Sequence, residues 1–135
     1  MSGMEKSSSL VGRLLLSFIF VLSGCSKIAG WNQSTAFIAS KGIPIVNMML
    51  ASAVIVEVLG GLALLVGFRA RIAAGVLFLF LIPTTVIFHN FWALQGMERM
   101  DNMAHFLKNL AIMGGLLMVV AFGPGPLCLD ARRRA

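Results

Sequence analysis

Four long apolar runs limit what this chain can fold into. They cover residues 10–28, 46–68, 72–92 and 104–122. As a helix, each run is long enough to cross about 30 Å of hydrocarbon at roughly 1.5 Å per residue. Backbone polar groups cannot face lipid without partners, and the connections between the runs are short. The sequence therefore predicts one all-α domain over residues 1–135, an integral membrane, antiparallel four-helix bundle.

Composition agrees with a membrane location. The chain is 59% hydrophobic and only 12% charged, which is too little charge to cover the surface of a soluble domain of this size. Its net charge of +6 lies mostly beside the apolar runs. Such charges are typical of loops that orient membrane helices, so we expect a lipid bilayer, and not nucleic acid, as the partner.

The distribution of lysine and arginine predicts the orientation. If the N-terminus is cytoplasmic, one side of the membrane holds Lys6, Arg13, Arg69, Arg71, Arg132, Arg133 and Arg134. The other side keeps Lys27, Lys41 and Arg99. Because positively charged loops tend to stay in the cytoplasm, both termini are expected there.

The stretch VLSGCSK, residues 21–27, leaves two interpretations of the first run open. Residues 22–25 fit a lipobox, in which case the leader is cleaved and the protein begins at a lipidated Cys25. Otherwise the same residues end a permanent helix. Arg13 leaves an apolar leader of only about nine residues, at the short end for a signal peptide, so we expect the uncleaved helix.

Glu57 is the clearest candidate functional residue, because it lies near the middle of the second run. Placing an ionisable group at the centre of the hydrocarbon costs at least about 2.5–3.5 kcal/mol. The carboxyl group must therefore face the bundle and be either paired or protonated. Two interpretations stay open: a structural ion pair that fixes helix packing, or a direct catalytic role.

Further polar residues gather in the outer half of the predicted bundle. Lys27 lies at the end of the first run, and His89 lies in the outer part of the third. The fourth helix, which we expect to extend a few residues before its apolar run, carries a polar stripe that fits an arc of about 120°. The stripe consists of Asp101, Asn102, His105, Lys108 and Asn109. Lys108 could instead extend to the membrane surface, and His105 could simply line a helix interface.

Hydrogen-bond donors beside apolar walls suit the carbonyl oxygens of a quinone, and an ionisable group can handle its protons. The pattern suggests Glu57 and His89 as catalytic residues. The residues expected to bind the quinone are Lys27, His89, His105, Lys108 and Asn109. A haem between the two histidines and a metal site are both disfavoured, because two histidines and one deep carboxylate are too few ligands.

Several segments resemble the DoxX family of small bacterial membrane proteins over nearly the whole chain. They are GRLLLSFIFVLSGCSKIAGW, VEVLGGLALLVGFRARIAA, IFHNFW and NMAHFLKNLAIMGGLLMVVAFGPGPLCLD. The residues that match the family pattern are Arg13, Gly24, Lys27, Glu57, Gly60, Gly61, Arg71 and the segments around His89 and Lys108. The resemblance implies a multi-pass protein of the bacterial inner membrane.

The same resemblance implies two functions from different classes. The family is named for its similarity to a membrane subunit of a thiosulfate:quinone oxidoreductase, which favours a quinone-linked oxidoreductase or its membrane subunit. Other members resemble partners of oxidative-stress proteins or assembly factors, which favours a non-catalytic membrane anchor or assembly factor. The sequence contains no dinucleotide fingerprint, so an oxidoreductase of this kind would need a soluble or membrane redox partner.

Overall fold

The computed structural model describes residues 2–132, and every regular element in this part is helical. Residues 133 and 134, two of the arginines counted for the orientation, lie outside it. The elements are α1 (Gly3–Ala29), α2 (Trp31–Ser40), α3 (Val46–Val66), α4 (Ala70–Phe88), η1 (Phe91–Ala93), α5 (Gly96–Phe122) and α6 (Leu129–Arg132). The four long helices α1, α3, α4 and α5 are apolar enough to cross a membrane, which confirms the predicted all-α class.

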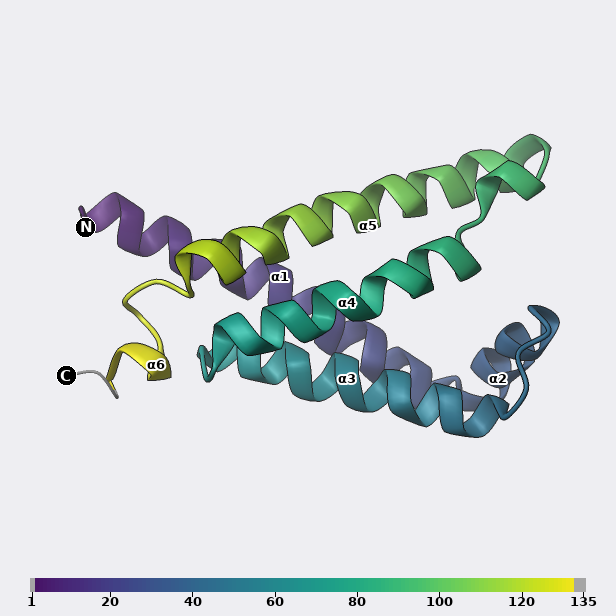
Figure 1. Cartoon of the computed structure of the whole chain (residues 1–135), viewed down its shortest axis with the longest axis horizontal. Helices are drawn as coiled ribbons and strands as arrows, with labels where there is room; N and C mark the ends of the chain where they lie inside the picture. Colours follow the sequence, from purple (N-terminus) through teal and green to yellow (C-terminus); the bar gives the residue numbers. More distant parts are fainter. Residues whose placement is uncertain (1, 133–135) are drawn as a thin grey trace.

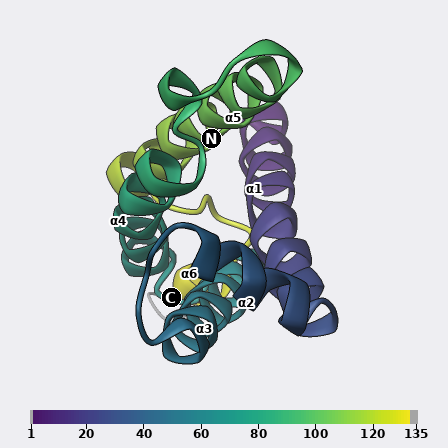
Figure 2. The same cartoon turned by 90° about the vertical axis from the view of Figure 1, so that its right-hand side faces the viewer.

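The long helices form a bundle in which α1 packs along α3, α3 along α4 and α4 along α5, whereas α1 and α5 touch much less (Figures 1 and 2). Both described ends of the chain lie at one end of the bundle, and α2 lies at the other (Figure 1). We call these the inner end and the outer end, following the predicted orientation.

Helix α3 is central because two adjacent glycines let its neighbours approach closely. A Cβ atom added to Gly61 would lie 2.9 Å from a methyl group of Val21 on α1. One added to Gly60 would lie 2.9 Å from a methyl group of Leu77 on α4. Small residues are a common way to bring membrane helices together, because apolar side chains gain little by leaving lipid. Leu77 belongs to the buried core shared by the four long helices.

The helix ends differ from the ends of the predicted apolar runs. Two helices begin earlier than their runs, because polar residues continue the helix, and one helix ends earlier. Helix α1 begins at Gly3 instead of residue 10 because Ser2 and Glu5 form a capping box. Helix α5 begins at Gly96 instead of residue 104. At the other extreme, α4 ends at Phe88, four residues before the predicted end at 92, and η1 follows it.

The C-terminal segment after α5 is fastened across the inner end. Arg13 of α1 is buried, and its Nη1 and Nη2 atoms donate to the carbonyl oxygens of Pro124 at 3.1 Å and Leu127 at 2.8 Å. The carboxylate of Asp130 accepts from the backbone N–H groups of Arg69 at 2.7 Å and Ala70 at 2.9 Å. These bonds join the segment to both α1 and the start of α4.

Candidate functional site

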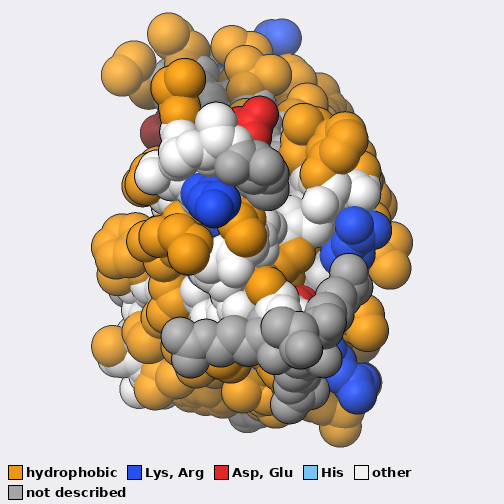
Figure 3. Space-filling model, turned by 90° about the vertical axis from the view of Figure 1, so that its left-hand side faces the viewer, with side chains coloured by type: hydrophobic (Ala, Val, Ile, Leu, Met, Phe, Trp, Pro, Cys, Tyr) orange, Lys and Arg blue, Asp and Glu red, His pale blue; other side chains and the backbone are white. Residues whose placement is uncertain are grey.

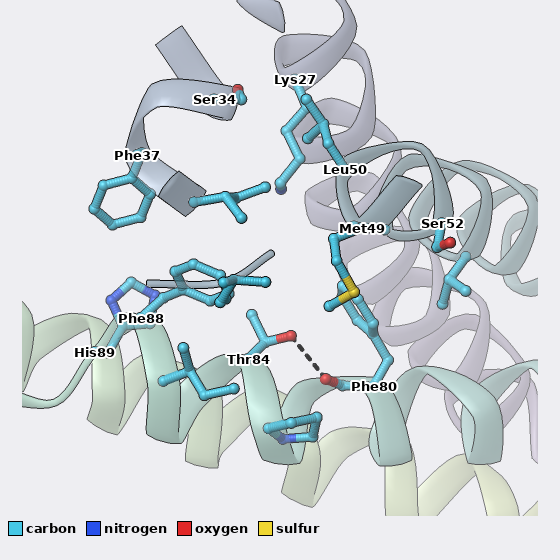
Figure 4. Close-up of a pocket in the computed structure, with 16 residues that line it drawn as sticks. Lys27, Ser34, Phe37, Met49, Leu50, Ser52, Phe80, Thr84, Phe88 and His89 are labelled. Carbon is cyan, nitrogen blue, oxygen red and sulfur yellow. Dashed lines mark hydrogen bonds between the residues drawn. The ribbon is translucent and has the colours of Figure 1, made fainter. Parts of the chain in front are cut away.

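The outer half of the bundle contains a cavity of about 410 Å³ between α1, α2, α3 and α4 (Figure 4). This volume falls within the range of roughly 300–1,000 Å³ that small-molecule sites occupy. Most of the wall is apolar and includes Phe37, Ile38, Met49, Leu50, Ala53, Val56, Phe80, Pro83, Ile87 and Phe88. The ionisable side chains on the wall are Lys27 and His89.

The short helix α2 closes this cavity at the outer end. Figure 2 shows it in front of α3, between α1 and α4. Phe37 of α2 meets Phe88 of α4 with ring centroids 5.6 Å apart. Just after α2, the Nζ atom of Lys41 donates to Oδ1 of Asn90 at 3.0 Å. Because ten residues are too short to span a bilayer, α2 is not a fifth transmembrane helix, and it serves as a cover.

Lys27 and Glu57 form an ion pair beside the cavity. The Nζ atom of Lys27 lies 3.0 Å from Oε1 and 2.9 Å from Oε2 of Glu57. Ser23 completes the group, because its Oγ atom donates to Oε1 at 3.1 Å and accepts from Lys27 at 2.7 Å. Glu57 is only 5% exposed. The carboxylate therefore has the cationic partner that its depth required, and of the two side chains it is Lys27 that lines the cavity (Figure 4).

The two histidines stack on each other at the outer end of α4 and α5. The rings of His89 and His105 have centroids 5.2 Å apart and planes inclined by 24°. The ammonium group of Lys108 can only donate, so Nδ1 of His105, 3.0 Å away, is the acceptor. The Nε2 atom of His105 then carries the hydrogen and lies 3.8 Å from Oδ2 of Asp101. This group extends from the cavity wall at His89 to the exposed Asp101.

His89 also has an unsatisfied polar atom. Its Nδ1 atom is buried and lacks a hydrogen-bond partner among residues 2–132. A buried polar atom of this kind costs free energy unless a ligand or water satisfies it. His89 is thus a polar side chain on a wall that is otherwise largely apolar, and its unsatisfied Nδ1 atom is the buried part of the ring.

Asn109 lies deeper than the histidines and joins α4 to α5. It is 6% exposed, and its Nδ2 atom donates to Oγ1 of the buried Thr85 at 3.0 Å. This bond helps to set the rotation of α5 against α4. Neither residue is on the cavity wall in the described structure.

The structure thus divides the residues singled out in the sequence into three groups. Lys27 and His89 reach the cavity, and Glu57 lies directly behind Lys27. His105 and Lys108 lie on the far side of His89, and Asn109 packs between helices. Sequence reasoning missed the cover formed by α2. The apolar pair Phe37 and Ile38 between the first two runs was the available signal for it.

These features define a class: small four-helix membrane proteins with a ligand-sized, mostly apolar cavity and an internal ion pair. The chain belongs to the DoxX family, whose family model matches residues 8–90.

Two relatives in Escherichia coli cover most of the chain. The chain is 34% identical to the inner membrane protein YqjF over 96% of this chain and 95% of the relative. It is 32% identical to the inner membrane protein YphA over 91% of this chain and 88% of the relative. A Surfeit locus protein 4 homolog of Schizosaccharomyces pombe is 30% identical over 93% of this chain but only 37% of its own length. No solved structure matches the chain.

Proposed function

We propose that this protein binds a quinone, or a similarly flat amphipathic molecule, in the cavity of the outer half. It would act as a quinone-linked oxidoreductase or as the membrane subunit of one, in the bacterial inner membrane with both termini in the cytoplasm. The observation that carries the proposal is the placement of Lys27 and His89 on different walls of an otherwise largely apolar cavity (Figure 4).

The chemistry of the wall suits the two parts of a quinone. Its carbonyl oxygens accept hydrogen bonds, which the ammonium group of Lys27 and the ring of His89 can donate. Its ring faces and apolar tail match the aromatic and aliphatic side chains of α2, α3 and α4. Lys27 is held in place by Glu57 and Ser23, and its ammonium group would donate to a ligand by exchanging or sharing one of these three contacts.

The same two side chains, Lys27 and His89, would also take part in proton transfer to the quinone. A quinone that takes up two electrons also takes up two protons to become a quinol. Glu57 contacts Lys27 directly and can exchange a proton with it, and His89 is backed by His105 and the exposed Asp101. A partner protein with its own redox centre would deliver or remove the electrons. His105, Lys108 and Asn109 would then position His89 and α5 and would not touch the ligand.

The quinone content of gently purified protein tests this proposal. We expect the wild type to retain quinone and His89→Ala to retain much less, because one of the two polar contacts is removed. Arg99→Ala is the matched control: it removes an exposed polar side chain of α5 that is not on the cavity wall. Equal quinone in all three proteins, with folding intact, would show that His89 is not part of the site.

A non-catalytic membrane anchor or assembly partner is the second candidate function. One observation favours it: Lys27, Glu57 and Ser23 satisfy one another's hydrogen bonds and charges, so the group is stable without a ligand. Buried ionic groups can serve to specify how helices associate. If no quinone is retained or bound by any preparation, this second function replaces the first.

A further inference from the structure

A second cavity, of about 450 Å³, lies at the inner end of the bundle. Its walls come from the first turn of α4, the end of α5 and the C-terminal segment. Figure 3 looks onto this end, where lysine and arginine side chains lie on the surface. This cavity is separate from the quinone site proposed above, which lies at the outer end.

The C-terminal wall of the cavity is held in a fixed position. Asp130 accepts the backbone N–H groups of Arg69 and Ala70, and its own N–H donates to the carbonyl oxygen of Gly67 at 2.9 Å. Gly123, with φ of 86°, turns the chain at the end of α5, a conformation that favours glycine. The wall is therefore built by specific bonds to the helices, and its shape is preorganised.

Two arginines face this cavity without a carboxylate partner. Arg69 and Arg71 both line it, and neither forms an ion pair or a side-chain hydrogen bond within residues 2–132. Arg69 does contact the ring of Phe68, with Cζ 6.0 Å from the centroid. Asp130 also lines the cavity, but both its oxygens are taken by backbone N–H groups. Two guanidinium groups against one engaged carboxylate leave the cavity with surplus positive charge.

The position of Arg71 adds a geometric constraint. A Cβ atom placed on Gly123 would lie 3.4 Å from both Nε and Nη2 of Arg71. Because Cζ is farther away, at 3.8 Å, the Nε–Nη2 edge of the guanidinium group is the part that lies beside Gly123. The guanidinium group is planar and carries five N–H donors in a rigid arrangement, which matches the oxygens of a phosphate.

The membrane side of the cavity is apolar and open. Ile72 is 61% exposed and Phe122 is 75% exposed, and both line the cavity where α4 and α5 enter the apolar part of the bundle. A ligand with an anionic head and hydrocarbon tails fits this combination. We propose that the inner cavity binds the phosphate head group of an anionic phospholipid, with its acyl chains running past Ile72 and Phe122. Basic pockets between membrane helices on the cytoplasmic side are known to hold such head groups.

Native mass spectrometry of the full-length protein in detergent micelles tests the proposal. Phosphatidylglycerol is titrated as the anionic lipid and phosphatidylcholine as the zwitterionic comparison. We expect phosphatidylglycerol to bind preferentially, and Arg71→Gln to lower its affinity by roughly fivefold. Arg71→Lys should recover part of the loss, because the charge returns without the planar donors. Lys6→Gln, which removes one exposed charge at the same end, should leave the affinity unchanged.

Three results would overturn the proposal. One is equal binding of the two lipids. Another is an equal loss of affinity in Lys6→Gln and Arg71→Gln, which would indicate only a general attraction to a basic surface. The third is displacement of the bound lipid by glycerol 3-phosphate at an equal concentration, which would assign the cavity to a soluble phosphate. Arg71→Gln should keep its unfolding midpoint in lipid-free micelles, since the side chain has no hydrogen bonds to lose within the described residues.

Discussion

Lys27 of α1 and Glu57 of α3 join the first two membrane helices through a doubly contacted ion pair, with Nζ 3.0 and 2.9 Å from the two carboxylate oxygens. The Lys27 side chain is 31% exposed, while that of Glu57 is 6% exposed. The carboxylate is therefore the group that depends on the pair. Lys27 in turn connects the ion pair to the outer cavity.

Breaking this pair from one side should destabilise the protein more than removing both partners. Lys27→Met leaves a buried carboxylate without its cation, which costs about 3 kcal/mol. Lys27→Met combined with Glu57→Met should regain most of that loss, because apolar pairs of similar volume are tolerated in such positions. The free energies of unfolding of both single variants and the double variant, measured in mixed micelles, provide the comparison. A double variant whose loss equals the sum of the two single losses would contradict the pairing.

Close contact between α1 and α3 should make Gly61 sensitive to a single added methyl group. Gly61→Ala places Cβ 2.9 Å from Val21 and 3.1 Å from Phe20, so we expect a loss of about 1–3 kcal/mol. Gly75→Ala on α4 is the matched control, because its Cβ has no neighbour within 4 Å. That change should be neutral or stabilise the helix by up to about 1 kcal/mol. Similar unfolding midpoints for the two variants would show that α1 and α3 do not approach closely at Gly61.

The four apolar runs allowed the fold to be predicted from the sequence. A segment of this length and composition in a bilayer must satisfy its backbone hydrogen bonds internally, and a transmembrane helix does so. The depth of Glu57 likewise predicted its need for a partner. The polar stripe of the fourth run was less informative. Helical periodicity places His105 and Lys108 on one arc of α5. The bond between Asn109 and Thr85 helps to set how α5 is rotated against α4. In this rotation the arc faces His89 instead of the cavity. The cover formed by α2 depends on contacts between distant residues, such as Lys41 with Asn90.

Asp130 should control the start of α4 through the backbone N–H groups of Arg69 and Ala70. Asp130→Ala removes both acceptors, and we expect a loss of about 0.5–2 kcal/mol, as for other capping residues. Hydrogen exchange should become faster at these two amides, whereas Asp101→Ala, which removes an exposed carboxylate at the outer end, should leave them protected. Unchanged exchange in Asp130→Ala would show that the C-terminal segment does not cap α4.

The predicted topology has four uncleaved membrane helices with both termini in the cytoplasm. Reporter fusions should place residues near 42 and 95 outside and the turn at residues 67–69 inside, because the inner end carries more arginine. The intact mass of the membrane-extracted protein should include the residues before Cys25. A mature mass that begins at a diacylated Cys25 would contradict this topology.

The most direct measurement of the central claim is a titration of the purified protein with ubiquinone-1, a quinone with a short tail. Ala53 lines the outer cavity, so Ala53→Phe should fill part of it without changing any polar group. Ala111→Phe makes the same change at an exposed position of α5 and serves as the control. We predict saturable binding to the wild type and to Ala111→Phe, and at least about tenfold weaker binding to Ala53→Phe. Equal affinity in all three proteins, or no saturable binding in any of them, would contradict a quinone site in this cavity.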